Sequence, residues 1–225
     1  MRVDGQVLVS PSVLDADLSR LRTEVDKVAA VADMIHLDVM DNHFVPNLSF
    51  GLPVITPLLR DESLRADCHL MIDDPDRWAV SYAEAGAYSV TFHIEAARDA
   101  ARICSGVRRA GARAAVAVKP GTDLSAVEAL GDSLDMIVIM TVEPGFGGQS
   151  FMTEMLGKVE RARRLADRSS GEIWVQVDGG VGLDTIASCA SAGANVFVAG
   201  SAVFRSTDPA EMVERLRSLA LQARC

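Results

Sequence analysis

Eight short runs of apolar residues, rich in valine and isoleucine, recur along the whole 225-residue chain. Runs of this length that are bounded by glycine and polar residues are typical of buried β-strands. We expect strands at Gln6–Ser10, Met34–Met40, Asp67–Ile72, Tyr88–Ile94, Ala114–Lys119, Asp135–Thr141, Ile173–Gly179 and Asn195–Gly200. This recurrence limits the possible folds more than any other feature of the chain.

Helical patterns separate the predicted strands, and no linker or low-complexity segment divides the chain. The clearest helical patterns cover Asp15–Val31, Asp74–Gly86, Met152–Arg168 and Asp208–Arg224. Three of the segments between strands end in Ala-Gly-Ala, where the glycine suits the left-handed turn after a helix. Eight alternating units favour a (β/α)8 TIM barrel over an open doubly wound sheet, which usually has about five to seven strands. We therefore expect residues 1–225 to form a single catalytic domain of the α/β class.

Composition excludes several classes of partner. Lys and Arg number 22 against 31 Asp and Glu, a net charge of −9, and no basic cluster exceeds an arginine pair, so nucleic acid and anionic membranes are poor partners. The four cysteines form no Cys-x-x-Cys pair, which is typical of thiols in a reducing compartment. The chain begins without a secretory pattern and has no apolar run of about 18 residues. We expect a soluble, cytoplasmic protein.

Polar side chains gather at the predicted C-terminal ends of the strands, where a barrel of this kind builds its active site. His36 and Asp38 follow each other on one face of a strand, about 6.6 Å apart. His69 and Asp178 end two other strands, and Ser10 and His93 also lie at strand ends. Two imidazoles and two carboxylates predict a site for one divalent ion, Fe²⁺, Zn²⁺, Mn²⁺ or Co²⁺.

Glycine-rich turns follow the last three predicted strands. The segment VEPGFGGQSF covers Val142–Phe151, and the shorter turns are DGG at Asp178–Gly180 and AGSA at Ala199–Ala202. Glycines leave backbone N–H groups free to surround an anion, and these loops commonly bind phosphate in TIM barrels. The sequence therefore predicts a phosphate site beside the metal site.

Three methionines, Met40, Met71 and Met140, end strands with inward parity and predict a flexible pocket wall. The candidate for a Schiff base is Lys119, but the adjoining Pro120 and Gly121 indicate a loop role, which disfavours a lysine-dependent aldolase. Cys68 has the parity opposite to His69 and should face the helices, which argues against a cysteine nucleophile.

Several segments between Ser10 and Phe204 resemble, in order, the signature segments of ribulose-phosphate 3-epimerases. They are SPSVLDADLSRL, HLDVMDNHFVPNLSFG, CHLMI, TFHIEA, VKPGT, MTVEPGFGGQSF, VDGGV and FVAGSAVF. The resemblance implies a metal-dependent isomerase of carbohydrate metabolism that epimerises D-ribulose 5-phosphate to D-xylulose 5-phosphate at C3, as in the pentose phosphate pathway. Where many members carry Met-Asp-Gly, this chain has Asn42 after Asp41, a difference confined to a loop.

The resemblance also implies roles for individual residues. His36, Asp38, His69 and Asp178 would bind the metal, with Asp38 and Asp178 exchanging the roles of proton acceptor and proton donor through an enediolate. Ser10 and His69 would contact the sugar. The loop after the sixth strand would close over the phosphate. The residues that would hold the phosphate are Gly145, Phe146, Gly147, Gly148, Gly179, Gly180, Gly200 and Ser201. The partner would be a small sugar phosphate, and we expect a homo-oligomer.

Three alternatives stay open at this point. The first is a 3-epimerase of a six-carbon ketose phosphate such as allulose 6-phosphate, with the same machinery and a longer pocket. A barrel similar to orotidine phosphate decarboxylase would need a lysine among the aspartates of its third strand, and DCHLMI has none. A non-catalytic sugar-phosphate-binding barrel would not need paired aspartates around a metal. The sequence leaves open the native metal, the number of subunits and the pathway.

Overall fold

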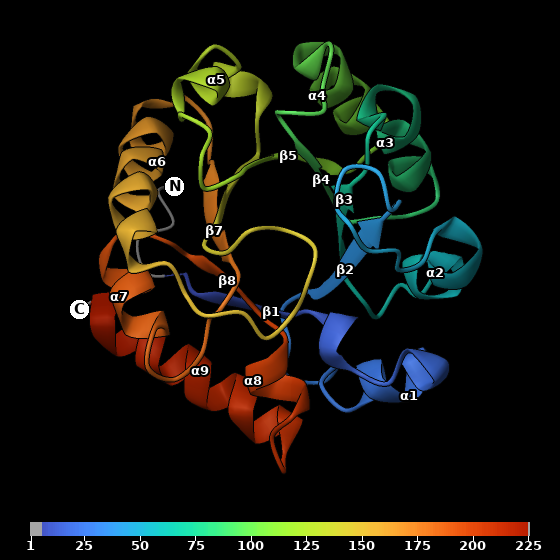
Figure 1. Cartoon of the computed structure of the whole chain (residues 1–225), viewed down its shortest axis with the longest axis vertical. Coiled ribbons are helices and arrows are strands. Elements are labelled where there is room, and N and C mark those ends of the chain that lie inside the picture. The colour runs from blue at the N-terminus through green and yellow to red at the C-terminus, as the bar shows by residue number, and fades with distance from the viewer. Residues whose placement is uncertain (1–5, 225) are drawn as a thin grey trace.

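A computed structural model of the chain, which describes residues 6–224, contains one parallel sheet of eight strands. The strands are β1 (Leu8–Pro11), β2 (Ile35–Met40), β3 (Ala66–Met71), β4 (Ser89–His93), β5 (Arg113–Val118), β6 (Met136–Met140), β7 (Trp174–Asp178) and β8 (Val196–Ala199). They follow the order β1-β8-β7-β6-β5-β4-β3-β2. A parallel bridge between Ser12 and His36 joins the two ends of the sheet, so the barrel is nearly closed (Figure 1). The predicted TIM-barrel fold is confirmed.

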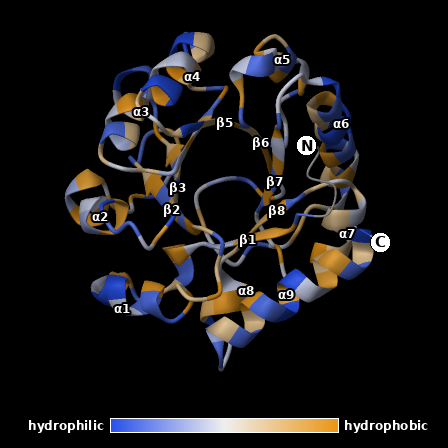
Figure 2. Cartoon of the chain, turned by 180° about the vertical axis from the view of Figure 1, so that it is seen from behind, coloured by the Kyte–Doolittle hydropathy of each residue, from blue (hydrophilic) through white to orange (hydrophobic). Residues whose placement is uncertain are grey.

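The helices form a ring outside the barrel (Figure 1). They are α1 (Leu21–Asp26), α2 (Leu52–Leu59), α3 (Pro75–Glu84), α4 (Ala100–Arg109), α5 (Ser125–Glu128), α6 (Leu156–Arg168), α7 (Ile186–Ser191), α8 (Ser201–Phe204) and α9 (Pro209–Arg224), with short 3-10 turns η1 (Val13–Asp15), η2 (Leu18–Arg20), η3 (Gly131–Ser133) and η4 (Thr153–Met155). Figure 2 shows both hydrophilic and hydrophobic residues on these helices, as expected for helices with one face on a sheet and one in water. None of the helices within residues 6–224 has the length and apolar character to span a membrane.

Alternation along the strands divides the side chains between two environments. Residues such as Val9, Leu37 and Cys68 belong to the large apolar core shared with the helices, which places Cys68 on the side predicted for it. The opposite side chains fill the barrel interior, where Leu8, Met136 and the other members of a second apolar cluster lie. The polar residues that concern function occupy the interior nearer the C-terminal ends of the strands.

The segment after β1 differs from the expectation. The helical pattern at Asp15–Val31 is interrupted, and only Leu21–Asp26 forms an α-helix. Two 3-10 turns precede it because the Ser12 hydroxyl and the Asp17 carboxylate accept backbone N–H groups of Leu14 and Ser19, a local pairing that competes with a continuous helix. The first strand also ends at Pro11 rather than at Ser10, so the chain enters the barrel mouth one residue later than predicted.

Within residues 6–224, positive φ angles occur at glycines and at one asparagine. Gly86, in one of the Ala-Gly-Ala segments, has φ 112°, and a Cβ there would lie 2.6 Å from the carbonyl oxygen of Leu59. Asn42, the residue in the place of the family's glycine, has φ 60°, a conformation that asparagine tolerates better than most residues. The loop after β2 therefore contains one left-handed residue, Asn42.

Candidate active site

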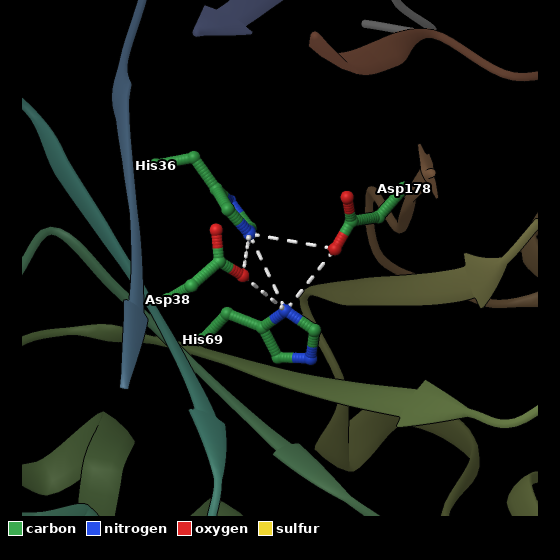
Figure 3. A group of neighbouring side chains, drawn as sticks. All are labelled: His36, Asp38, His69 and Asp178. Atoms are coloured by element: carbon green, nitrogen blue, oxygen red, sulfur yellow. Dashed lines mark hydrogen bonds and ion pairs between the residues drawn. The ribbon is translucent and has the colours of Figure 1, made fainter. Parts of the chain in front are cut away.

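Four polar side chains converge inside the C-terminal mouth of the barrel. His36 and Asp38 project from β2, His69 from β3 and Asp178 from β7, and Figure 3 shows Asp178 facing the other three from across the barrel. Each side chain offers one nitrogen or oxygen atom, and the four atoms lie within 4.8 Å of one another. All four residues are buried. This cluster could hold a divalent metal ion.

Close contacts join the four atoms. His69 Nδ1 lies 3.3 Å from Asp38 Oδ1 and 3.1 Å from Asp178 Oδ2. His36 Nε2 lies 3.4 Å from the same oxygen of Asp38, 3.6 Å from Asp178 Oδ2 and 3.3 Å from His69 Nδ1. Both carboxylates thus turn one oxygen toward both imidazoles, the arrangement that a shared cation requires.

The orientation of His36 is set from beneath the cluster. Its Nδ1 atom lies 2.9 Å from Asp67 Oδ2, and the Gln176 amide donates to the same oxygen at 2.8 Å. A carboxylate acceptor keeps a proton on Nδ1, so Nε2 is the ring atom that faces the cluster and can bind a metal ion once it is deprotonated. Asp67 and Gln176 were not predicted from the sequence, although Asp67 shares the inward parity of His69 and that signal could have found it.

A second chain of contacts orients His69. Its Nε2 atom lies 2.9 Å from His93 Nε2, and His93 Nδ1 lies 3.3 Å from Glu95 Oε2. Burial lowers the pKa of His93 to about 4, so its ring is neutral near pH 7. Because the Nδ1–H of His93 donates to Glu95, His93 Nε2 accepts a hydrogen bond from the Nε2–H of His69. This leaves His69 Nδ1 as the ring atom that can bind a metal ion. His93, predicted only to end a strand, thus positions a neighbour.

The pKa shifts of the four side chains indicate that the cluster favours a positive charge at its centre. Burial opposes the charge on His36, but the carboxylates around it, Asp38 foremost, outweigh burial and raise its pKa. The pKa of His69 is raised in the same way, against burial, by hydrogen bonds to Asp178 and Asp38. Burial likewise disfavours ionised Asp38 and Asp178, yet the imidazoles lower the pKa of both. The chemistry of this donor set therefore fits a divalent cation.

A cavity opens above the cluster. Asp38 and Asp178 form part of its lining, whereas His36 and His69 lie below it. Its wall includes all three methionines predicted there, Met40, Met71 and Met140. The segment that follows β6 lies over the centre of the barrel in Figure 1. A small polar ligand in this cavity would meet both carboxylates at its floor.

The glycine-rich turns after β6, β7 and β8 meet at one side of the cavity. Its lining includes every residue predicted to hold phosphate: Gly145, Phe146, Gly147, Gly148, Gly179, Gly180, Gly200 and Ser201. Gly180 has φ 66°, and a Cβ there would lie 2.7 Å from the backbone nitrogen of Phe151. Within the described chain, the N–H groups of Gly147, Gly148 and Gly180 make no hydrogen bond to a backbone or side-chain acceptor, so they are free to bind an anion.

The structure corrects the expectation for Ser10. Because β1 continues through Pro11, Ser12 lies one inward step nearer the mouth and lines the cavity, whereas Ser10 does not. The Ser12 hydroxyl donates to Asp38 Oδ2 at 2.6 Å. Ser10 is fully buried, and its hydroxyl has no partner among residues 6–224. Ser12 was not predicted, although it has the same parity as Ser10, because the predicted strand ended at Ser10.

Comparison with known proteins agrees with the site. The sequence model of the ribulose-phosphate 3 epimerase family matches residues 8–204. A protein of Mycobacterium leprae named ribulose-phosphate 3-epimerase is 51% identical over 95% of this chain and 95% of its own. One of the same name from Mycobacterium tuberculosis is 50% identical over 96% of this chain and 94% of its own.

Solved structures resemble this one in fold. The crystal structure of 3-hexulose-6-phosphate synthase from Salmonella typhimurium superimposes with a TM-score of 0.68 at 20% identity, covering 96% of this chain and 100% of its own. That likeness extends to the barrel alone, whereas the sequence matches include the strand ends and turns that build the cavity. On this evidence the chain belongs to the ribulose-phosphate 3-epimerase family.

Proposed function

We propose that the protein is an isomerase that interconverts D-ribulose 5-phosphate and D-xylulose 5-phosphate by epimerisation at C3. The observation that carries the proposal is the pair Asp38 and Asp178, which reach one cavity floor from β2 and β7. The curated relatives named above carry the name of this activity. The described barrel would serve it as one catalytic domain.

Inversion at a carbon next to a carbonyl needs two acid/base groups. One removes the proton from one face of the substrate, and the other returns a proton to the opposite face of the planar enediolate. The imidazoles lower the pKa of both carboxylates, so either can accept the C3 proton, and the carboxylate that is to donate must first take up a proton from solvent or from the preceding turnover. In one direction Asp38 would accept and a protonated Asp178 would donate, and in the other the roles exchange.

Ser12 prepares Asp38 for this role. Its hydroxyl donates to Oδ2, whereas Oδ1 faces the imidazoles, so the two oxygens of Asp38 have different partners. The hydrogen bond fixes the plane of the carboxylate against the cavity floor. Proton transfer is sensitive to such positioning, since the acceptor oxygen must come within hydrogen-bond reach of the C3 proton.

We propose that His36, Asp38, His69 and Asp178 hold one divalent ion, with Fe²⁺, Zn²⁺, Mn²⁺ and Co²⁺ as the candidates for this nitrogen and oxygen donor set. Such an ion supplies Lewis-acid stabilisation of the negative charge that develops on the substrate oxygens. Asp67 and His93 would keep the two imidazoles in the tautomers that bind it. The glycine-rich turns would hold the phosphate and fix the distance of C3 from the two carboxylates.

Isotope exchange in single-aspartate variants tests the proposal. Asp38→Asn and Asp178→Asn should each reduce epimerisation by about 10²-fold or more, the lower end of what a positioned acid/base group contributes. Each variant should still exchange the C3 hydrogen of one epimer with deuterated water while forming little of the other. Asp26→Asn, a change of the same kind in an exposed i,i+4 pair on α1, is the matched control.

Metal content must be measured in each variant, because asparagine is a weaker ligand than aspartate. If both metal-loaded variants lost exchange from both epimers equally, one acid/base group per face would be the wrong assignment. A wild-type protein without epimerase activity on either pentulose phosphate would refute the proposal as a whole. Turnover of D-allulose 6-phosphate, measured beside it, separates five-carbon from six-carbon preference.

We also propose that copies of the chain associate. Leu48 and Val54, large apolar side chains beside the start of α2, are 70% and 53% exposed, and such side chains are the usual material of subunit contacts. Sedimentation velocity at micromolar concentration tests this, and a purely monomeric protein would refute it.

A reducing cytosol suits the protein, since Cys68, Cys104 and Cys189 are buried free thiols.

A further inference from the structure

A carboxylate lies where the glycine-rich turns meet. Asp15, the last residue of η1, lines the cavity, and only 9% of its side chain is exposed. A Cβ at Gly147 would collide with this carboxylate, and a Cβ at Gly200 would come within 3.0 Å of Asp15 Oδ2. The space left by these two glycines, from the turns after β6 and β8, is therefore filled by an acidic side chain from the turn after β1.

Arg205 is the partner of this carboxylate. Its Nη2 atom donates to Asp15 Oδ1 at 2.6 Å, although the arginine side chain is 66% exposed. The guanidinium also lies over the turn after β6, because a Cβ at Gly148 would be 3.2 Å from Nη2. An exposed cation thus lies at the rim of the glycine turns, paired with a largely shielded anion.

These contacts create a conflict with the proposed phosphate site. Gly147, Gly148 and Gly200 line the same cavity as Asp15, and a phosphate bound by their N–H groups would lie against its carboxylate. Two anions so close repel each other strongly, more so in a cavity than in water. A guanidinium, by contrast, pairs with phosphate as well as with carboxylate.

We propose that Asp15 takes the place of the substrate phosphate in the empty enzyme, and that Arg205 exchanges the Asp15 carboxylate for the phosphate when substrate binds. Asp15 then turns out of the glycine turns, and Arg205 becomes a phosphate-binding residue. In the enzyme without substrate, the pairing with Asp15 holds Arg205 at the rim, close to the phosphate site. Competition from the Asp15 carboxylate makes the affinity for the substrate phosphate lower than the glycine turns and Arg205 would give alone. This inference deepens the proposed function and depends on it.

Binding of inorganic phosphate to the metal-loaded protein, measured by calorimetry at low ionic strength, tests the exchange. Asp15→Asn keeps the side-chain volume and removes the competing charge, so it should lower the Kd for phosphate by about tenfold. The KM for D-ribulose 5-phosphate should fall by a larger factor than any change in kcat. Asp167→Asn, which changes the net charge equally in the exposed Arg163–Asp167 pair of α6, should leave the Kd unchanged.

Arg205→Gln should raise the phosphate Kd by about tenfold, and it should do so in the Asp15→Asn background as well. If Arg205 served only to hold Asp15 in place, Arg205→Gln would not change the phosphate Kd in the Asp15→Asn background. That result would overturn the proposed contact between Arg205 and the phosphate. Asp15→Ser, which removes both charge and volume, provides a second test if Asp15→Asn lowers the melting temperature.

The outcomes separate the inference from the function it rests on. Wild-type protein that neither epimerises ribulose 5-phosphate nor binds phosphate would refute both. An active, phosphate-binding wild type whose Asp15→Asn and Asp15→Ser variants bind phosphate no more tightly would overturn the exchange alone. Tighter binding in both variants, together with weaker binding in Arg205→Gln, is the result that supports it.

Discussion

His36 Nδ1 lies 2.9 Å from Asp67 Oδ2, and both side chains are completely shielded from solvent. A carboxylate behind a ligating histidine holds the ring in place and increases its basicity, and its loss typically weakens metal binding by about 10- to 100-fold. We expect Asp67→Asn to weaken divalent-metal affinity by this factor, as measured by competition with a chelating dye. The exposed Asp26→Asn variant should bind metal as the wild type does. Equal affinity in both variants would show that Asp67 does not support the ligand.

Removal of the metal should abolish epimerisation, because the negative charge that develops on the substrate oxygens would then lack Lewis-acid stabilisation. Dialysis against a chelator should remove activity, and Fe²⁺, Zn²⁺, Mn²⁺ or Co²⁺ should restore it. The same ions should raise the melting temperature, since they bind the folded cluster and not the unfolded chain. Full turnover by protein shown by elemental analysis to be metal-free would contradict the assignment.

Two glycine substitutions should have opposite effects. Gly180→Ala places a methyl group 2.7 Å from the backbone of Phe151 at φ 66°, so we expect a loss of stability of about 1–3 kcal/mol and a raised KM. Gly157→Ala, within α6 and with nothing within 4 Å of the new methyl group, should stabilise the protein by about 0.5–1 kcal/mol. Urea denaturation measures both. A neutral Gly180→Ala would mean that the turn after β7 relaxes freely.

The buried thiols give a dependence on alkaline pH. Burial raises the pKa of Cys104 and Cys189 to about 12, against 9.0 for the exposed group. These thiols should not react with a disulfide reagent at pH 8 until the protein unfolds. Because their folded pKa values are raised, their stabilising contribution is complete below pH 9.0 and declines above it, by about 1.4 kcal/mol per pH unit for each thiol. Cys104→Ala should reduce the slope of unfolding free energy against pH, and an unchanged slope would contradict the assignment.

The strands and the four-residue cluster could be predicted because each depends on local sequence and one rule of assembly. Runs of valine and isoleucine mark buried strands, and parallel strands in a barrel bring their C-terminal ends together. His36 and Asp38 share a strand face, so their proximity follows from alternation alone. His69 and Asp178 could be added because the barrel places them around the same mouth.

Residues that act through a neighbour were harder to predict. The contact of Gln176 with Asp67 joins positions 109 apart in the chain, and no spacing rule connects β3 to β7. Ser12 was missed because a one-residue error in a strand end exchanges the serine at the mouth for the one beneath it. Asp15 lay in a segment predicted as helix, where an acidic residue is expected on the solvent side. Each miss arose where the position depends on three-dimensional packing.

The cluster draws its members from both ends of the chain, with consequences for the order of folding. His36, Asp38 and His69 can come together as soon as β2 and β3 pair, but Asp178 joins them only when β7 has been added through β6 and β8. During synthesis on the ribosome, an early half-barrel would therefore present three ligands with an open coordination position. The fourth ligand would arrive only with the last strands, so metal binding would favour the completed barrel and slow its reopening.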